Sequence, residues 1–174
     1  MVKAIFPGTF DPIHYGHIDI ANRAADIFDE LIVGVYDKPL KKLIFSPEQR
    51  LELTRESFKD RENIKVIGYN TLTVQFAQEV GAKVIVRGLR VFSDFEHEFR
   101  MALANRRLNK EIEVFALITS EEHTFLSSTT VREIAALGGD VSTMEPPHVA
   151  KALGVEMVEM GDSNRMNLHS SLRD

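Results

Sequence analysis

Short apolar runs alternate five times with longer amphipathic segments along this chain, and this alternation constrains its fold more than any other feature. The apolar runs are rich in Val and Ile and end at Gly, Pro or polar residues. They predict strands over Lys3–Phe6, Leu31–Tyr36, Ile64–Ile67, Val84–Val86 and Val114–Ile118. Because helices supply the long crossovers that parallel strands require, the pattern predicts an α/β protein with an open, five-stranded parallel sheet and helices on both faces.

The segments between the strands carry the spacing of amphipathic helices. They predict helices over Ile18–Phe28, Ser46–Lys59, Val74–Val80, Asp94–Leu108 and Thr130–Leu137. Ser46 is the expected N-cap of the second helix, with Pro47 at its first position. A chain of 174 residues suffices for one domain with a substantial core, which we place at residues 1–154. Periodicity fades in the tail, residues 155–174, and we expect its last dozen residues to be disordered.

Charge and composition narrow the classes of function. The net charge of −5 gives no support to general binding of nucleic acid. The absence of cysteine excludes disulfides, thiolate catalysis and zinc sites with cysteine ligands. No apolar run approaches the length of a membrane span, and the first ten residues lack the apolar core of a signal peptide. We therefore expect a cytoplasmic protein without a membrane partner.

Polar clusters follow all five predicted strands, at the edge of the sheet where ligands of open parallel sheets bind. In chain order these clusters read PGTFDPIHYGH, DKPLKK, GYNTLT, RGLR and TSEEHTFLSST. They supply the cations Lys41, Lys42, Arg87 and Arg90, and hydroxyl groups at Thr9 and at residues 127–130. Cations that converge on one edge of an acidic protein indicate a polyphosphate ligand.

The first cluster places two histidines in a strand-to-helix turn. His17 would stand in the first turn of the helix, where the dipole disfavours a resident cation but suits an imidazole that donates to a phosphate oxygen. His14 and His17 could instead be surface or packing histidines, and zinc is a poorer interpretation because no third ligand is apparent. The glycine fingerprints of dinucleotide-binding proteins and of P-loops are both absent.

The residues His14-Tyr15-Gly16-His17 match the H-x-G-H signature of the nucleotidyltransferase superfamily. From residue 2 to about residue 154 the chain resembles the bacterial phosphopantetheine adenylyltransferases, through GTFDPIHYGHIDIANRA, KPLKKLIFSPEQR, VIVRGLRVFSDFEHEFRMALANRRL and TFLSSTTVREIAALGGDVS. The resemblance implies a Rossmann-like fold and Mg²⁺-dependent transfer of an adenylyl group from ATP to 4′-phosphopantetheine, giving dephospho-coenzyme A and pyrophosphate. It also implies a homo-hexamer and inhibition by coenzyme A.

The resemblance further implies roles for individual residues. As catalytic groups, His17 would bind the α-phosphate of ATP, Lys41 would bridge the attacking and attacked phosphates, and Arg90 would contact the phosphates of ATP. Phosphopantetheine would be bound by Thr9, Lys41, Thr73 and Arg87. ATP would be bound by Thr9, Phe10, His17, Gly88, Leu89, Arg90, Glu98, His123, Thr124, Phe125, Leu126, Ser127, Ser128 and Thr129. No residue is assigned as a metal ligand. A phosphate oxygen is already ionised near neutral pH, so the attack needs positioning and charge neutralisation rather than a general base.

Several positions depart from the pattern of the family or have structural alternatives. The departures are His14, Tyr15, Leu40, His97 and His123. Arg87 could pair structurally with Asp94 or Glu98, and the Ser127–Thr129 segment could simply cap a helix. Two other functions stay open: transfer to another small-molecule acceptor, and nucleotide binding without catalysis.

Overall fold

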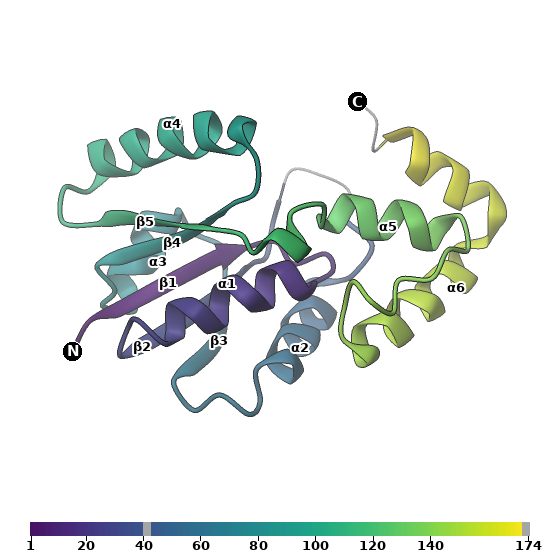
Figure 1. Cartoon of the computed structure of the whole chain (residues 1–174), viewed down its shortest axis with the longest axis horizontal. Helices are drawn as coiled ribbons and strands as arrows, with labels where there is room; N and C mark the ends of the chain where they lie inside the picture. The colour runs from purple at the N-terminus through teal and green to yellow at the C-terminus, as the bar shows by residue number, and fades with distance from the viewer. Residues whose placement is uncertain (40–42, 172–174) are drawn as a thin grey trace.

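Five parallel strands form a single sheet in the computed structural model, which describes residues 1–39 and 43–171 (Figure 1). Residues 92–93 and 162–171 are described by their backbone alone. The strands are β1 (Lys3–Gly8), β2 (Glu30–Tyr36), β3 (Ile64–Tyr69), β4 (Val84–Leu89) and β5 (Glu113–Ile118), in the spatial order β3-β2-β1-β4-β5. All neighbouring strands are parallel, which confirms the predicted sheet.

Three strands extend beyond their predicted carboxyl ends. The first strand is predicted to end at Phe6 because Pro7 and Gly8 follow it. In the structure Pro7 pairs with Gly34 of β2, and Gly8 pairs with Val35. Backbone pairing with the neighbouring strand thus continues through residues of low strand propensity. In the same way β3 continues to Tyr69 and β4 to Leu89.

The five predicted helices are confirmed, with shifted ends. They are α1 (Tyr15–Ala25), α2 (Pro47–Ser57), α3 (Thr73–Glu79), α4 (Phe92–Leu108) and α5 (Ser128–Ala136), and a short 3₁₀ turn, η1, spans Glu121–His123. The Ser46 side chain accepts a hydrogen bond from the Gln49 N–H and Pro47 is the first residue of α2, as predicted. Helix α1 begins earlier than expected, at Tyr15, which places His17 in its first turn.

The two faces of the sheet are buried under different helices. Ala4 and Phe6 of β1 pack with apolar side chains of α1 on one face, and Leu51 and Leu53 of α2 join that cluster. The alternate residue of the strand, Ile5, packs on the other face with Val74, Phe76 and Ala77 of α3. The period of two along β1 therefore produces the predicted coverage of both faces.

A final helical segment, α6 (Pro147–Ser171), was not among the predicted helices, and its backbone is kinked at Gly161, where φ is 64°. It packs against α5 beyond the arrowheads of the strands (Figure 1) and buries Leu153 and Met157 beside Val131. The domain boundary predicted after Gly154 falls inside this helix, whereas the disorder of the last dozen residues stays a prediction. None of the helices within residues 1–39 and 43–171 has the length and apolar character needed to cross a membrane.

The order of the strands reverses at β1, between β2 and β4. Neighbouring β1 and β4 pair in register only at Ala4–Val84 and Ile5–Ile85, near their amino ends. Further along, these two strands no longer pair in register. The carboxyl ends of β1 and β4 therefore flank a crevice at the topological switch point of the sheet.

Candidate active site

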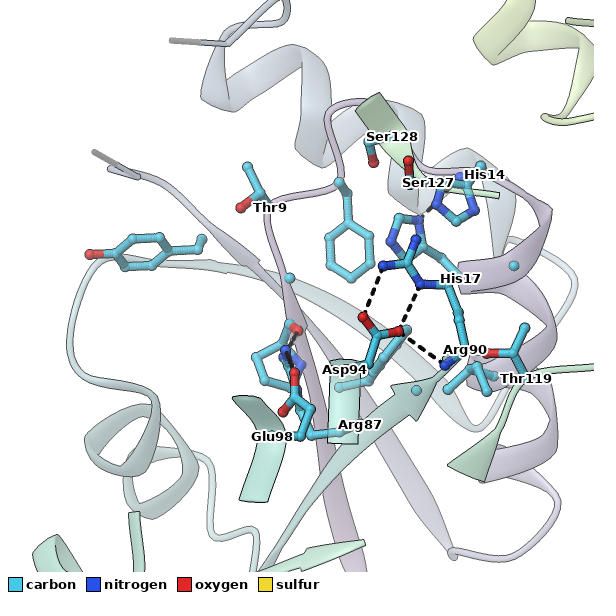
Figure 2. A pocket seen from close by; sticks show the side chains of 18 of the residues that line it. Thr9, His14, His17, Arg87, Arg90, Asp94, Glu98, Thr119, Ser127 and Ser128 are labelled. Atoms are coloured by element: carbon cyan, nitrogen blue, oxygen red, sulfur yellow. Dashed lines mark hydrogen bonds and ion pairs between the residues drawn. The ribbon is translucent and has the colours of Figure 1, made fainter. Parts of the chain in front are cut away.

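A cavity of about 590 Å³ opens at this crevice (Figure 2). Segments far apart in the sequence converge on it: the turn after β1, the start of α1, the ends of β2, β3 and β4, and the start of α5. The predicted site residues that line it are Thr9, Phe10, His17, Thr73, Arg87, Gly88, Arg90, Glu98, Leu126, Ser127, Ser128 and Thr129. The fold thus brings most of the predicted residues together around one cavity.

The turn after β1 is shaped around the ring of Phe10. Phe10 adopts a φ of 50°, in the left-handed region that non-glycine residues seldom occupy. Its ring is 2% exposed and meets the His17 ring edge-on, at 5.0 Å between centroids. A Cβ atom on Gly8 would lie 2.8 Å from Cζ of Phe10, so residue 8 must be glycine for this ring to fit. Phe10 therefore forms a wall of the cavity and supports His17.

His14 holds the imidazole of His17 from two directions. The backbone N–H of His14, the N-cap of α1, donates to Nδ1 of His17 over 3.3 Å, and the two rings stack at 3.7 Å. A nitrogen that accepts a hydrogen bond carries no proton, so the neutral ring of His17 is protonated at Nε2. A Cβ on Gly16 would lie 3.1 Å from the His14 ring, so glycine leaves the room that this stack needs.

The His14 side chain is itself uncharged near neutral pH. Burial is the main cause that lowers its pKa to about 3, and the nearby Arg90 and His123 add to this shift. Nδ1 of His14 is buried and has no hydrogen-bond partner among the described residues. The departure at position 14 therefore adds a neutral aromatic support beneath His17 without adding a cation to the site.

Two arginines at the end of β4 are each paired with a carboxylate of α4 (Figure 2). Nε and Nη2 of Arg87 donate to Glu98 at 2.7 and 2.6 Å, and Nη1 of Arg87 donates to the Pro7 carbonyl at 3.0 Å. This confirms the pairing with Glu98, one of the two structural alternatives predicted for Arg87.

Arg90 is held in the same manner by Asp94. Nε of Arg90 donates to Asp94 Oδ2 at 3.1 Å, and Nη1 of Arg90 donates to the Leu126 carbonyl at 2.9 Å. Partial burial raises the pKa of Asp94, but the hydrogen bonds from Arg90 outweigh it and lower the pKa overall. Asp94 thus stays ionised, and the guanidinium of Arg90 has a fixed direction at the rim of the cavity.

The first turn of α5 supplies hydroxyl groups and a helix N-terminus. The Ser127 side chain accepts from the Thr130 N–H at 3.0 Å, which confirms the capping alternative. Ser128 Oγ donates to the Pro12 carbonyl at 2.9 Å and so ties α5 to the turn after β1. Since Ser127, Ser128 and Thr129 also line the cavity, the positive end of the α5 dipole lies at its wall, where an anion is favoured.

Some predicted residues lie elsewhere. Leu89, His123, Thr124 and Phe125 do not line the cavity; the His123 ring stacks on Tyr15 at 6.5 Å, and Phe125 is 60% exposed. Lys41 lies outside the described residues. Conversely, Tyr36, Tyr69, Asp94 and Thr119 line the cavity without having been predicted. Tyr36 ends β2 as predicted, so taking the last residue of that strand would have found it, whereas Tyr69 lies two residues beyond the predicted end of β3.

The chemistry of the cavity is that of an anion site. It combines two guanidinium groups, an imidazole and a helix N-terminus. Among the side chains that the structure describes, no group of three from His, Cys, Asp or Glu could hold a metal ion. The two carboxylates of the cavity, Asp94 and Glu98, are engaged by arginines. The arrangement suits the binding and polarisation of phosphate groups.

Comparisons with known proteins agree with this chemistry. Residues 5–134 match the model of the cytidylyltransferase-like family. The chain is 50% identical over 153 residues to the phosphopantetheine adenylyltransferase of Roseiflexus sp. (strain RS-1), covering 88% of this chain and 96% of that protein. It is 51% identical over 150 residues to the phosphopantetheine adenylyltransferase of Xylella fastidiosa (strain 9a5c), covering 86% and 93%. A crystal structure from Vibrio parahaemolyticus superposes with a TM-score of 0.64 at 23% identity, covering 88% of this chain and 99% of that one, which supports the fold alone.

Proposed function

The chain belongs to the phosphopantetheine adenylyltransferase family, and we propose that the cavity between β1 and β4 is where it joins the adenylyl group of ATP to 4′-phosphopantetheine. This reaction of coenzyme A biosynthesis yields dephospho-coenzyme A and pyrophosphate. The observation that carries the assignment of the site is the convergence of Thr9, His17, Arg90 and the first turn of α5 on one cavity at the switch point of the sheet.

The mechanism we propose needs no general base. A phosphate oxygen of phosphopantetheine attacks the α-phosphorus of ATP, the new P–O bond forms, and the bond to the departing pyrophosphate breaks. The fixed protonation of His17 at Nε2 gives a neutral donor for an oxygen of the α-phosphate. Because stacking and the backbone hydrogen bond hold the ring in place, little reorganisation is needed as charge develops in the transition state.

The paired arginines retain donors for substrate. The guanidinium of Arg90 donates Nε and Nη2 to Asp94 and one Nη1 proton to Leu126, so one proton of Nη1 and one of Nη2 remain. We assign these to the phosphates of ATP. By the same count Arg87 keeps two protons, which we assign to phosphopantetheine. Each Glu98 oxygen accepts one bond from Arg87 and keeps a lone pair, which a ribose hydroxyl can use.

Other proposed roles rest on the family. Thr9 contacts the reacting phosphates, Phe10 lines the nucleotide site, Thr73 contacts phosphopantetheine, and Lys41 bridges the two reacting phosphates. Gly88, Leu89 and the His123–Thr129 segment surround the nucleotide. Since the donor set of the described residues does not fit a protein-held metal ion, we propose that Mg²⁺ enters on the phosphate oxygens of ATP.

We further propose a cytoplasmic homo-hexamer that coenzyme A inhibits by occupying the same cavity. Helix α4 supports the self-association. It packs against β4 and β5, yet four of its large apolar side chains are 44–55% exposed: Phe95, Phe99, Met101 and Leu103. Phe95, Phe99 and Leu103 recur at a spacing of four and share one face of the helix, and an exposed apolar face of this kind favours burial against another copy of the chain. Light scattering after size exclusion would measure the mass of the assembly.

The experiment that tests the function is release of pyrophosphate from ATP and Mg²⁺ with different acceptors. We expect release with 4′-phosphopantetheine, and none with nicotinamide mononucleotide, glycerol 3-phosphate or no acceptor. Release with another acceptor alone would keep the fold and the chemistry but change the substrate. ATP binding without release in any arm would point to a silent nucleotide-binding protein.

A further inference from the structure

A buried carboxylate beneath the cavity joins three separate segments of the chain. Asp11 is 1% exposed, and its Oδ1 and Oδ2 accept the backbone N–H groups of Phe45 and Ile44 at 2.9 and 3.0 Å. Arg132 of α5, 3% exposed, donates to Asp11 Oδ2 at 3.3 Å and also to the Asp11 backbone carbonyl. One carboxylate therefore links the turn after β1, the approach to α2 and the helix α5.

A second buried cation, Arg50, forms hydrogen bonds with the backbone of the same turn. Arg50 of α2 is fully buried, and its Nη1 donates to the carbonyls of Thr9 and Tyr36, both at 2.7 Å. Its Nη2 donates to the Asp37 carbonyl at 3.1 Å. Arg50 thus fixes the backbone at the carboxyl ends of β1 and β2, and the carbonyl of Thr9 lies beside the cavity that the Thr9 side chain lines.

These charges are costly to bury for stability alone. A buried ion pair is often no more stabilising than apolar side chains of the same volume, because both ions lose their hydration. The fork of Arg50 instead sets the relative position of three carbonyl groups, and Asp11 sets that of two amides and a helix. Phe10 lies between Thr9, which Arg50 contacts, and Asp11, which Arg132 contacts. Its left-handed φ of 50° is unfavourable and persists only where neighbouring contacts hold the backbone.

We propose that Asp11, Arg50 and Arg132 are positioning residues for the adenylyl transfer. Their hydrogen bonds fix the position of the turn that carries Thr9 and Phe10 relative to the first turn of α5. These two segments form the two sides of the proposed phosphate site, so their separation decides whether both can contact the substrate. This inference rests on the proposed roles of Thr9 and of the Ser127–Thr129 segment.

The test separates turnover from binding and from stability. In Arg50→Lys the positive charge remains but the fork that bridges the carbonyls is lost. We expect kcat to fall by about ten- to a hundredfold, as is typical when a supporting residue of a site is removed, while the KM for ATP stays within about threefold of wild type. Asp11→Asn should lower kcat in the same way.

The matched control is Ile112→Ala. Ile112 is buried before β5, at the end of the sheet opposite the cavity, so its truncation destabilises the core without touching the site. Both proteins are assayed well below their thermal midpoints. Equal kcat values for Arg50→Lys and the control, or losses that only track the unfolded fraction, would overturn the proposal. If Arg50→Lys does not fold, Arg132→Lys, which keeps the charge beside Asp11, gives the same comparison.

The wild-type protein is assayed first with 4′-phosphopantetheine, and Thr9→Ala is assayed beside it. An inactive wild-type protein would refute the proposed function. An active wild type with unimpaired Thr9→Ala would refute the role of Thr9, on which the positioning depends. An active wild type, an impaired Thr9→Ala and a fully active Arg50→Lys would refute only the positioning role.

Discussion

Glu145 makes the stability of the protein depend on pH. This carboxyl lies in the segment between α5 and α6, is fully buried, and both of its oxygens are buried without a hydrogen-bond partner among the described residues. Burial without compensation raises the pKa of Glu145 from 4.5 to about 8. The folded protein therefore binds this proton more tightly than the unfolded chain does.

The sign and size of the effect follow from linkage. A raised pKa in the folded state stabilises the protein fully below pH 4.5, and this contribution is lost as the pH rises towards 8. At about 1.4 kcal/mol per pKa unit, the complete loss is roughly 5 kcal/mol, of which about 4 kcal/mol falls between pH 5 and pH 9. This is a large part of the free energy of unfolding of a typical domain.

The substitution that tests this is Glu145→Gln, which keeps the shape and removes the ionisation. Urea unfolding at pH 5, 7 and 9 would measure the difference in free energy between the variant and wild type. We expect near-equal stability at pH 5 and an advantage for the variant of about 4 kcal/mol at pH 9, a shift of the midpoint of roughly 2 M urea. Glu62→Gln, at an exposed position, is the control. A difference that does not change from pH 5 to pH 9 would refute the reasoning.

Further predictions concern catalysis. His17→Ala should lower kcat by roughly two to four powers of ten and leave ATP affinity nearly unchanged, measured by steady-state kinetics and calorimetry; equal losses in both would mean that His17 only binds the ground state. Asp94→Asn should lower kcat/KM for ATP about tenfold because Arg90 loses its charged partner, whereas Glu96→Gln, on an exposed part of α4, should not. Lys41→Ala should raise the KM for 4′-phosphopantetheine, and an unchanged value would contradict its bridging role. Chelation of Mg²⁺ should stop pyrophosphate release, and added Mg²⁺ should restore it.

Much of the fold was predictable because its signals are local. Each strand is a short apolar run, and each of the first five helices has an amphipathic period. The order of the strands was not predicted, since the same alternation is compatible with several orders. Helix α6 was missed although Val149, Leu153 and Met157 recur at a spacing of four and are all buried. The flanking prolines and glycines masked that period.

The site was predictable in part for a different reason. Strand ends and the H-x-G-H signature locate Thr9, His17 and Arg90 without any knowledge of contacts. Contacts between residues distant in the chain were not predictable in this way: Asp11 and Arg132 are 121 residues apart. No pattern in a single sequence pairs such residues, so the buried network around Asp11 came only from the structure.

The incomplete pairing of β1 with β4 divides the sheet into two mechanical units. One unit, β3-β2-β1, comes from residues 3–69, and the other, β4-β5, from residues 84–118. Two register positions join these units, against six at each of the other three junctions. A nucleotide that contacts Thr9 on one side and Arg90 on the other would connect these two units through its own contacts. Substrate binding would then stiffen the molecule along its weakest internal boundary, and slower hydrogen exchange of the β4 amides in the presence of ATP would be its signature.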